Sequence, residues 1–233
     1  LKLTIIEPNR EVADQVFLRK PMPFLSGWPV LVDSPLYQSA AIADLDGDGD
    51  LEVVVGGRSG NDDGIIYAFH HTGEPVAGWP VKTYGNWQYQ YYPDSSPAIA
   101  DIDGDGKMEI VIKIIRSSGG FVTRYLTVYH NDGTPVAGWP VMITQGNNYI
   151  PGEDSSPAVA DVDGDGDMEI FIGDAPEPYS DGHLYAFHHD GRPVAGWPII
   201  LLGSGTIKSS PTIADINGDG DMEIVIGSGN NAY

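Results

Sequence analysis

Four copies of a short acidic segment carry the residues of this chain that are best suited to chemistry. Each copy places a side-chain oxygen at positions 1, 3, 5 and 9, a backbone carbonyl at position 7 and a glycine at position 6, as in "DLDGDGDLE". The residues at positions 1, 3, 5, 7 and 9 are Asp44, Asp46, Asp48, Asp50 and Glu52; Asp101, Asp103, Asp105, Lys107 and Glu109; Asp161, Asp163, Asp165, Asp167 and Glu169; and Asp215, Asn217, Asp219, Asp221 and Glu223.

Carboxylates held this close repel one another, which raises their pKa values unless a cation neutralises them. Alternate carboxylates followed by glycine match the first half of an EF-hand calcium loop. The second half differs, because the last carboxylate comes at position 9 instead of 12 and a strand follows instead of a helix. About six or seven oxygen ligands suit Ca²⁺, whereas Mg²⁺ prefers a tighter octahedron that retains water. The segments therefore predict about four Ca²⁺ sites; the alternative is a polar turn without metal.

The composition restricts the possible partners. The chain has 233 residues, of which 41% are hydrophobic, and a formal net charge of −21. This charge repels nucleic acid and anionic lipid and attracts cations, so nucleic acid is not an expected partner. A run of roughly 18 apolar residues is missing, so no membrane insertion is expected. The chain starts at Leu1 without a signal peptide, which leads us to expect a processed chain or part of a longer one.

Two further repeated segments define the elements that must position the acidic loops. Each unit predicts four strands: "SSPAIAD" before the loop, "MEIVIG" after it, then "LYAFHH", and finally "PVAGWP" as an edge strand because of its prolines. Repeated units of this kind predict an all-β fold, a β-propeller of four-stranded antiparallel blades. The tryptophans of the last segment are expected to pack between blades; they are Trp28, Trp79, Trp139 and Trp197.

We expect residues 1–233 to form a single β-propeller domain or a propeller fragment. The repeat units cover approximately 38–80, 95–140, 155–198, and 209–233 combined with 16–29. Residues 16–29 align without a gap to 67–80, so they could complete the last unit and close a four-bladed ring. The segment "KLTII" (2–6) resembles another second strand and slightly favours part of a propeller with about seven or eight blades. Both alternatives stay open.

The segment "DGDG" in the context D-x-D-G-D-G-x-x-E, between two strands, resembles the calcium-binding repeat of the integrin α-subunit β-propeller and of its bacterial relatives, the FG-GAP or VCBS repeats. The resemblance covers most of the chain. It implies a secreted or cell-surface protein in which calcium stiffens the blades and takes no part in catalysis. The Phe-Gly start of the integrin repeat is replaced by the "GWP" segment, so the resemblance does not imply an integrin-like ligand.

Residues that depart from the repeat are the candidates for ligand binding. Tyr84, Trp87 and Tyr89 lie in the connection "TYGNWQYQYYPD" between two blades. Lys113 stands where the other copies have glycine, and Arg116 follows it. Rings and cations that lie together suit an acidic glycan. The alternatives are rings that pack over a blade edge and a lysine that balances nearby carboxylates.

No catalytic residue is predicted, because no Ser-His-Asp set, cysteine nucleophile, phosphate loop or HExxH motif occurs. The histidines at the end of the third strand recur with the repeat, which favours a scaffold role over metal binding. We therefore expect a calcium-stabilised binding or adhesion module for carbohydrate or an extracellular surface protein. The alternatives are the propeller of a polysaccharide lyase similar to rhamnogalacturonan lyases, in which "EIV" runs into a lysine as it does from Glu109 to Lys113, and a structural spacer.

Overall fold

The computed structural model describes residues 25–58, 64–83, 90–118, 121–147, 155–174, 181–203 and 207–227, together with four short strands nearer the N-terminus. No helix occurs in these ranges, so none of their elements is a helix that could cross a membrane. The strands are β1 (Lys2–Leu3), β2 (Ile6–Glu7), β3 (Arg10–Glu11), β4 (Val16–Phe17), β5 (Ala41–Ala43), β6 (Glu52–Arg58), β7 (Gly64–Phe69), β8 (Val81–Thr83), β9 (Gln90–Pro93), β10 (Ala98–Ala100), β11 (Glu109–Ser118), β12 (Phe121–His130), β13 (Val141–Asn147), β14 (Ala158–Ala160), β15 (Glu169–Asp174), β16 (Gly182–His188), β17 (Ile199–Leu201), β18 (Thr212–Ala214) and β19 (Glu223–Val225).

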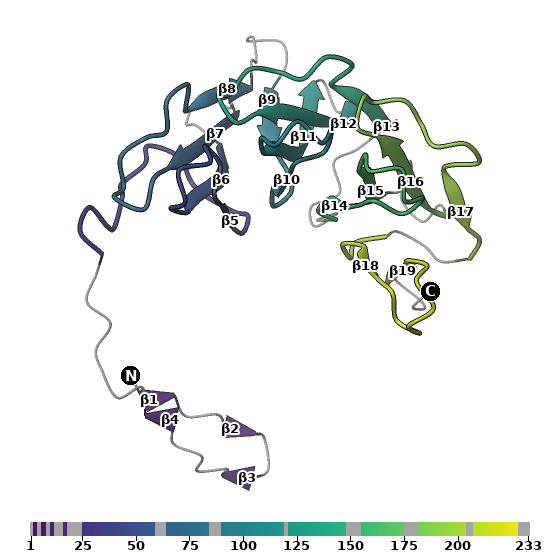
Figure 1. Ribbon diagram of the computed structural model, residues 1–233, viewed down its shortest axis with the longest axis horizontal. Helices are drawn as coiled ribbons and strands as arrows, with labels where there is room; N and C mark the ends of the chain where they lie inside the picture. The colour runs from purple at the N-terminus through teal and green to yellow at the C-terminus, as the bar shows by residue number, and fades with distance from the viewer. Residues whose placement is uncertain are drawn as a thin grey trace.

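The strands form successive antiparallel sheets, which confirms the predicted all-β class and the blades of a propeller-like fold. The sheet orders are β5-β6-β7-β8, β10-β11-β12-β13 and β14-β15-β16-β17, and we call these sheets blades 1, 2 and 3. The pair β18–β19 starts a fourth blade, blade 4. Figure 1 shows the blades along an arc, with β5, β10 and β14 on its inner side.

The arc is not closed into a ring within the described residues. A closed four-bladed ring would pair the segment around β4 with β19, but β4 pairs with β1. Residues Lys2 and Leu3 lie opposite Phe17 and Val16, which joins the segment "KLTII" to the predicted third strand. The size of the ring to which the blades belong stays a prediction.

Each acidic segment connects the first two strands of a blade in the same register. The alanine before position 1 pairs with the glutamate at position 9 in every copy, and β-branched side chains follow the glutamate in β6, β11 and β19. The pairs are Ala43 and Glu52, Ala100 and Glu109, Ala160 and Glu169, and Ala214 and Glu223. The acidic segments are therefore hairpin loops at one end of every blade.

The predicted fourth strand starts later than expected. The segment "PVAGWP" forms a turn with a single bridge between Phe69 and Pro75, and the outer strand β8 begins after it at Val81. Gly78 in this turn has a φ of 90°, and a Cβ there would lie 1.9 Å from the carbonyl oxygen of Asp132 in the next blade. The segment cannot extend into a strand because it turns tightly against its neighbour.

Blade 2 is longer than its neighbours at the end opposite its acidic loop. The strands β11 and β12 each have ten residues, and β9 pairs with the far half of β11. Tyr91 lies opposite Arg116 in this pairing. The last residues of the connection that leads into blade 2 therefore lie beside the far half of β11.

The hydrophobic core lies between successive blades. One cluster joins Val54 and Trp79 of blade 1 to Ile112 of blade 2, and another joins Val111 of blade 2 to Ile172 of blade 3. The second strands of blades 2 and 3, β11 and β15, are buried on both faces because each of these blades lies between two others, which accounts for the continuous apolar sequence of these strands.

Two sets of polar contacts also repeat from blade to blade. Three of the repeated tryptophans donate their Nε1–H to a backbone oxygen in the turn after the third strand of the next blade. The pairs are Trp28 and His71, Trp79 and Asn131, and Trp139 and His189, each at 2.8 Å. A serine ladder runs along the inner side, in which a backbone N–H of one blade donates to a hydroxyl of the next. Its rungs join Ser39 to Ser96 at 3.1 Å, Ser96 to Ser156 at 3.0 Å, and Ser156 to Ser210 at 2.9 Å.

Candidate functional site

The acidic loops fold around their own carboxylates. In the first loop, Asp44 accepts hydrogen bonds from the backbone N–H groups of Gly47 and Gly49, at 2.8 and 3.1 Å. Asp46 accepts from Asp48 N–H at 3.2 Å, and Asp48 accepts from Asp50 N–H at 2.8 Å. The two glycines have φ values of 78° and 94°, which explains why glycine occupies these positions. The loop thus fixes its carboxylates on one side of the turn.

The glutamate at position 9 is the buried anchor of each complete blade. Glu52, Glu109 and Glu169 are at most 1% exposed. One oxygen of each accepts the backbone N–H of position 2, at 2.8 to 3.1 Å. The other lies 3.1 to 3.2 Å from a histidine Nδ1 at the end of the third strand. These histidines are His70, His130 and His188.

The carboxylates of the loops lie close enough to share one ion. Oxygens of Asp101, Asp103 and Glu109 lie within 4.8 Å of one another, and so do those of Asp161, Asp163 and Glu169. In the first loop Asp44, Asp46 and Asp48 form such a group. Ligands at 2.3 to 2.6 Å from one Ca²⁺ are separated by about 5 Å or less, so these groups fit that ion.

The second loop also shows the electrostatic conflict that a cation would relieve. Oδ1 of Asp101 is buried without a hydrogen-bond partner among the described residues. Burial raises the pKa of Glu109 above its ordinary value, and the charge of Asp103 raises it further, although the N–H of Ile102 and His130 oppose the shift. An all-oxygen set with an orphaned carboxylate oxygen fits a hard divalent cation.

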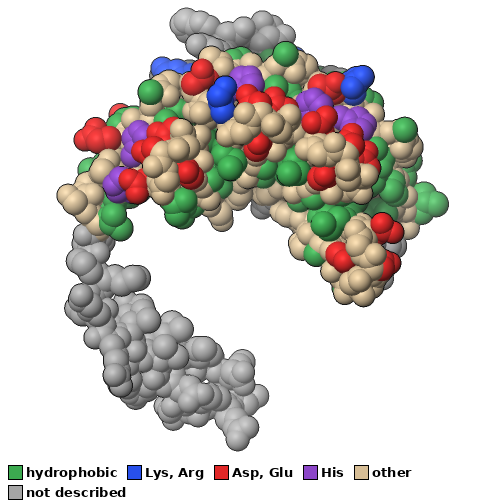
Figure 2. Space-filling view, viewed as in Figure 1, with side chains coloured by type: hydrophobic (Ala, Val, Ile, Leu, Met, Phe, Trp, Pro, Cys, Tyr) green, Lys and Arg blue, Asp and Glu red, His purple; other side chains and the backbone are tan. Residues whose placement is uncertain are grey.

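Sequence reasoning missed that histidines line the loops. Nδ1 of His71 lies 3.4 Å from Asp50, and Nδ1 of His189 lies 3.2 Å from Asp167. Blade 2 has Asn131 in place of this histidine and Lys107 in place of the aspartate, so both partners change together. The repetition of the histidines at the third strand was the available signal. Figure 2 shows histidines beside the acidic clusters along the arc.

The fourth loop differs in the partner of its glutamate. Asp215 still accepts hydrogen bonds from Gly218 and Gly220, at 2.6 and 2.9 Å. The Asn217 amide donates to Glu223 at 3.0 Å, at the oxygen that faces a histidine in the complete blades. Because Asn217 is an amide, the side chains at positions 1, 3, 5 and 9 of this loop carry one negative charge fewer than those at the same positions of the other three loops.

The residues predicted to bind a ligand are only partly within the described ranges. Tyr84, Trp87 and Tyr89 lie outside them, so their role stays a prediction. Lys113 is fully buried in β11, and its Nζ lies 3.6 Å from Asp94. Full burial does not fit the cationic wall of an open cleft, and it agrees with the alternative of charge balance. Arg116 is partly exposed, and its guanidinium lies 5.8 Å from the ring centre of Tyr125.

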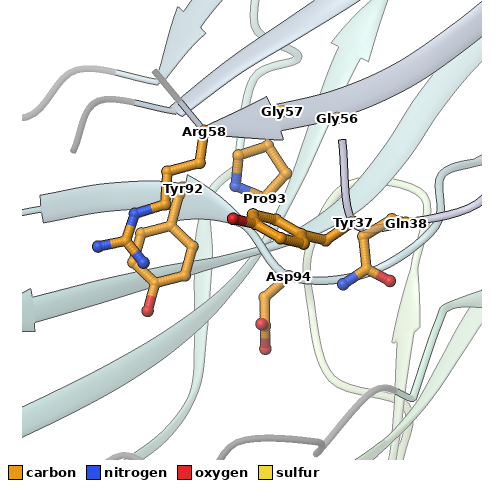
Figure 3. A pocket seen from close by; sticks show the side chains of 8 residues that line it. All are labelled: Tyr37, Gln38, Gly56, Gly57, Arg58, Tyr92, Pro93 and Asp94. Atoms are coloured by element: carbon orange, nitrogen blue, oxygen red, sulfur yellow. The ribbon is translucent and has the colours of Figure 1, made fainter. Parts of the chain in front are cut away.

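A pocket that the sequence reasoning did not foresee lies between blades 1 and 2. Its volume is about 300 Å³, and its lining residues are Tyr37, Gln38, Gly56, Gly57, Arg58, Tyr92, Pro93 and Asp94. Figure 3 shows Arg58 and Tyr92 on one side, Tyr37 and Gln38 toward the other, and Asp94 between them. Tyr37 and Gln38 break the Asp-Ser-Ser-Pro pattern of the next two units, which was the available signal.

Comparison with known proteins agrees with the geometry. A family model described as FG-GAP-like repeat matches residues 44–112 and 161–226, which together make up more than half of the chain. A comparison with curated proteins finds no match. The matched segments include all four acidic loops and the strands β6, β15 and β19, which follow three of them. The chain therefore belongs to the FG-GAP-like repeat family.

Proposed function

We propose that this chain is a calcium-stabilised β-propeller module, secreted or at the cell surface, that binds carbohydrate or an extracellular protein. The single observation that carries the calcium part is the orphaned, buried oxygen of Asp101 within a group of carboxylates that share one site. About four ions would hold the loops, one per copy. Extracellular calcium is concentrated enough to fill even weak loops of this kind, which favours that location.

The metal in this proposal is structural. Each loop joins the first two strands of a blade, and in blades 1, 2 and 3 its glutamate contacts the histidine at the end of the third strand. An ion at the loop would therefore fix three strands at one end of the blade. The opposite end, where blade 2 extends and the pocket lies, remains available for a ligand.

The loop that starts at Asp215 is expected to lose its ion first when a chelator is titrated. Asn217 supplies one charge fewer than Asp46, Asp103 or Asp163 at the same position, and ligand charge sets the affinity of such loops. Crystals equilibrated at limiting calcium measure the occupancy of each loop directly. The Asn217→Asp variant is the matched control, because it should remove the difference. Loss of calcium from another loop first would contradict the expectation.

The binding role is tested with the calcium-loaded chain on an array of neutral and uronate-containing glycans, with turnover of uronate polymers measured in parallel. Saturable binding without cleavage is the expected result. Cleavage would show a polysaccharide lyase instead. If the chain neither binds nor cleaves any glycan, its role in carbohydrate binding is overturned, and an extracellular protein ligand or a structural spacer is left.

A further inference from the structure

We propose that the pocket between blades 1 and 2 is a binding site for a sugar unit that carries a carboxylate, such as a hexuronate. This inference rests on the proposed binding function and assigns that function to a place. The pocket lies at the end of β6 away from its acidic loop, since Glu52 begins the strand and Arg58 ends it. A volume of about 300 Å³ is at the lower end of small-molecule sites and suits a single ring.

Three of the residues that line the pocket, Tyr37, Gln38 and Arg58, depart from the repeat. Tyr37 and Gln38 stand where the unit of blade 2 has Asp94 and Ser95, and Arg58 stands where it has Ile115. Gly56 and Gly57 allow close packing, because a Cβ at Gly56 would lie 2.6 Å from Pro93 and one at Gly57 would lie 2.9 Å from Leu36. Departures from the repeat converge here from two blades, which favours function over scaffold.

The cationic group of the pocket is oriented by a ring. The Arg58 guanidinium lies 4.2 Å from the ring centre of Tyr92, and this ring is 7% exposed. Stacking fixes the plane of the guanidinium and reduces the entropy lost when it binds a planar anion. Its N–H groups match the geometry of a carboxylate, which they bind with two parallel hydrogen bonds.

The anionic group of the pocket is the Asp94 carboxylate, and the buried Lys113 contacts it. The backbone N–H of Asp94 donates to the Lys113 carbonyl at 2.9 Å, and the Lys113 N–H donates to Ser95 at 2.9 Å. The buried ammonium lies 3.6 Å from the Asp94 carboxylate. The lysine that replaces a repeated glycine therefore acts as a positioning residue.

Tyr37 and Gln38 supply the remaining recognition groups. Tyr37 is 76% exposed, so its ring is accessible to the apolar face of a sugar. The Gln38 amide and the Asp94 carboxylate can bond hydroxyl groups as donor and acceptor. One carboxylate-binding group, one ring and two hydroxyl-binding groups match the chemistry of a uronate better than that of a neutral sugar.

The test is calorimetric titration of the calcium-loaded chain with glucuronate and galacturonate disaccharides and with their carboxyl-reduced counterparts. The uronates are expected to bind more tightly than the reduced sugars. Arg58→Gln should weaken uronate binding about tenfold to a hundredfold, since hydrogen bonds to charged groups are worth that much. Tyr37→Ala should weaken both classes about threefold to tenfold. Lys82→Gln, which removes an exposed cation from the same blade outside the pocket, should change neither.

Each other outcome is distinguishable. Equal binding of uronate and reduced sugar would overturn the carboxylate assignment. Uronate binding that survives Arg58→Gln but is lost in Asp103→Asn would place the sugar on the calcium ion and overturn the pocket, while the binding role would stand. If the unaltered chain bound no glycan at all, the carbohydrate-binding function on which the pocket assignment rests would be overturned. Arg58→Lys, which keeps the charge but not the paired hydrogen bonds, should bind with intermediate affinity, and an unchanged melting temperature confirms that the variants fold.

Discussion

Removal of calcium is expected to lower the melting temperature of this chain by roughly 10 °C or more. A ligand that binds the native state alone stabilises it by about 2.7 kcal/mol per site at a hundredfold excess over Kd. Several filled loops therefore contribute as much as the whole stability of an ordinary domain, about 5–15 kcal/mol. The structural reason is that the apo loops retain the repulsion seen around Glu109, whose pKa is raised by burial and by Asp103.

Thermal melting with and without EGTA measures this effect, with metal analysis to show that the protein is empty. Repeating the melt at high NaCl separates coordination from general charge, because salt screens the net charge but does not replace an ion at 2.4 Å or so from its ligands. Magnesium at equal concentration should restore little of the loss. An unchanged melt of the demonstrably metal-free chain would refute a structural role for calcium.

Trp139→Ala is expected to destabilise the chain by about 3–5 kcal/mol. The indole is 7% exposed in the core between blades 2 and 3, and its ring meets that of Phe187 edge to face at 6.0 Å. Its Nε1 also donates to His189 at 2.8 Å. The substitution removes both the ring and the bond that fastens the two blades.

Urea unfolding in calcium measures this loss, and two variants separate its causes. Trp139→Phe keeps most of the ring and leaves the carbonyl without its donor, so we expect a loss of about 1–3 kcal/mol. Trp28→Ala removes the same hydrogen bond at the first blade, where the indole is only half-buried, and should cost less than Trp139→Ala. Equal effects of Trp28→Ala and Trp139→Ala would show that burial between blades does not determine the contribution.

The repeated features could be predicted from the sequence because each depends on local chemistry. Alternate aspartates and glycines require a tight loop, and the β-branched residues after Glu52 and Glu109 require a buried strand. The strand after each "GWP" segment was placed too early, because the turn at Gly78 depends on contact with Asp132 in the next blade. Such a contact between blades has no local signature.

The environment of the non-repeated residues could not be predicted for a related reason. The sequence leaves open whether Lys113 binds a ligand or balances nearby carboxylates, and only the pairing of β9 with β11 and the side chain of Asp94 show that it is enclosed. The pocket likewise joins Tyr37, Arg58 and Tyr92 from two blades. These residues are far apart in the sequence and become neighbours only when the two blades pack together.

The serine ladder makes the blades interchangeable. In each rung a backbone N–H of one blade donates to a serine hydroxyl of the next blade. The second serine of a Ser-Ser-Pro segment therefore accepts a hydrogen bond from the blade before it, and its N–H donates one to the blade after it. Duplication of such a unit within the gene would lengthen the arc without the evolution of a new interface. The first blade donates through Ser39 alone. Tyr37 and Gln38 take no part in the ladder, so these positions could change toward ligand binding while the hydrogen bond from Ser39 to Ser96 was retained.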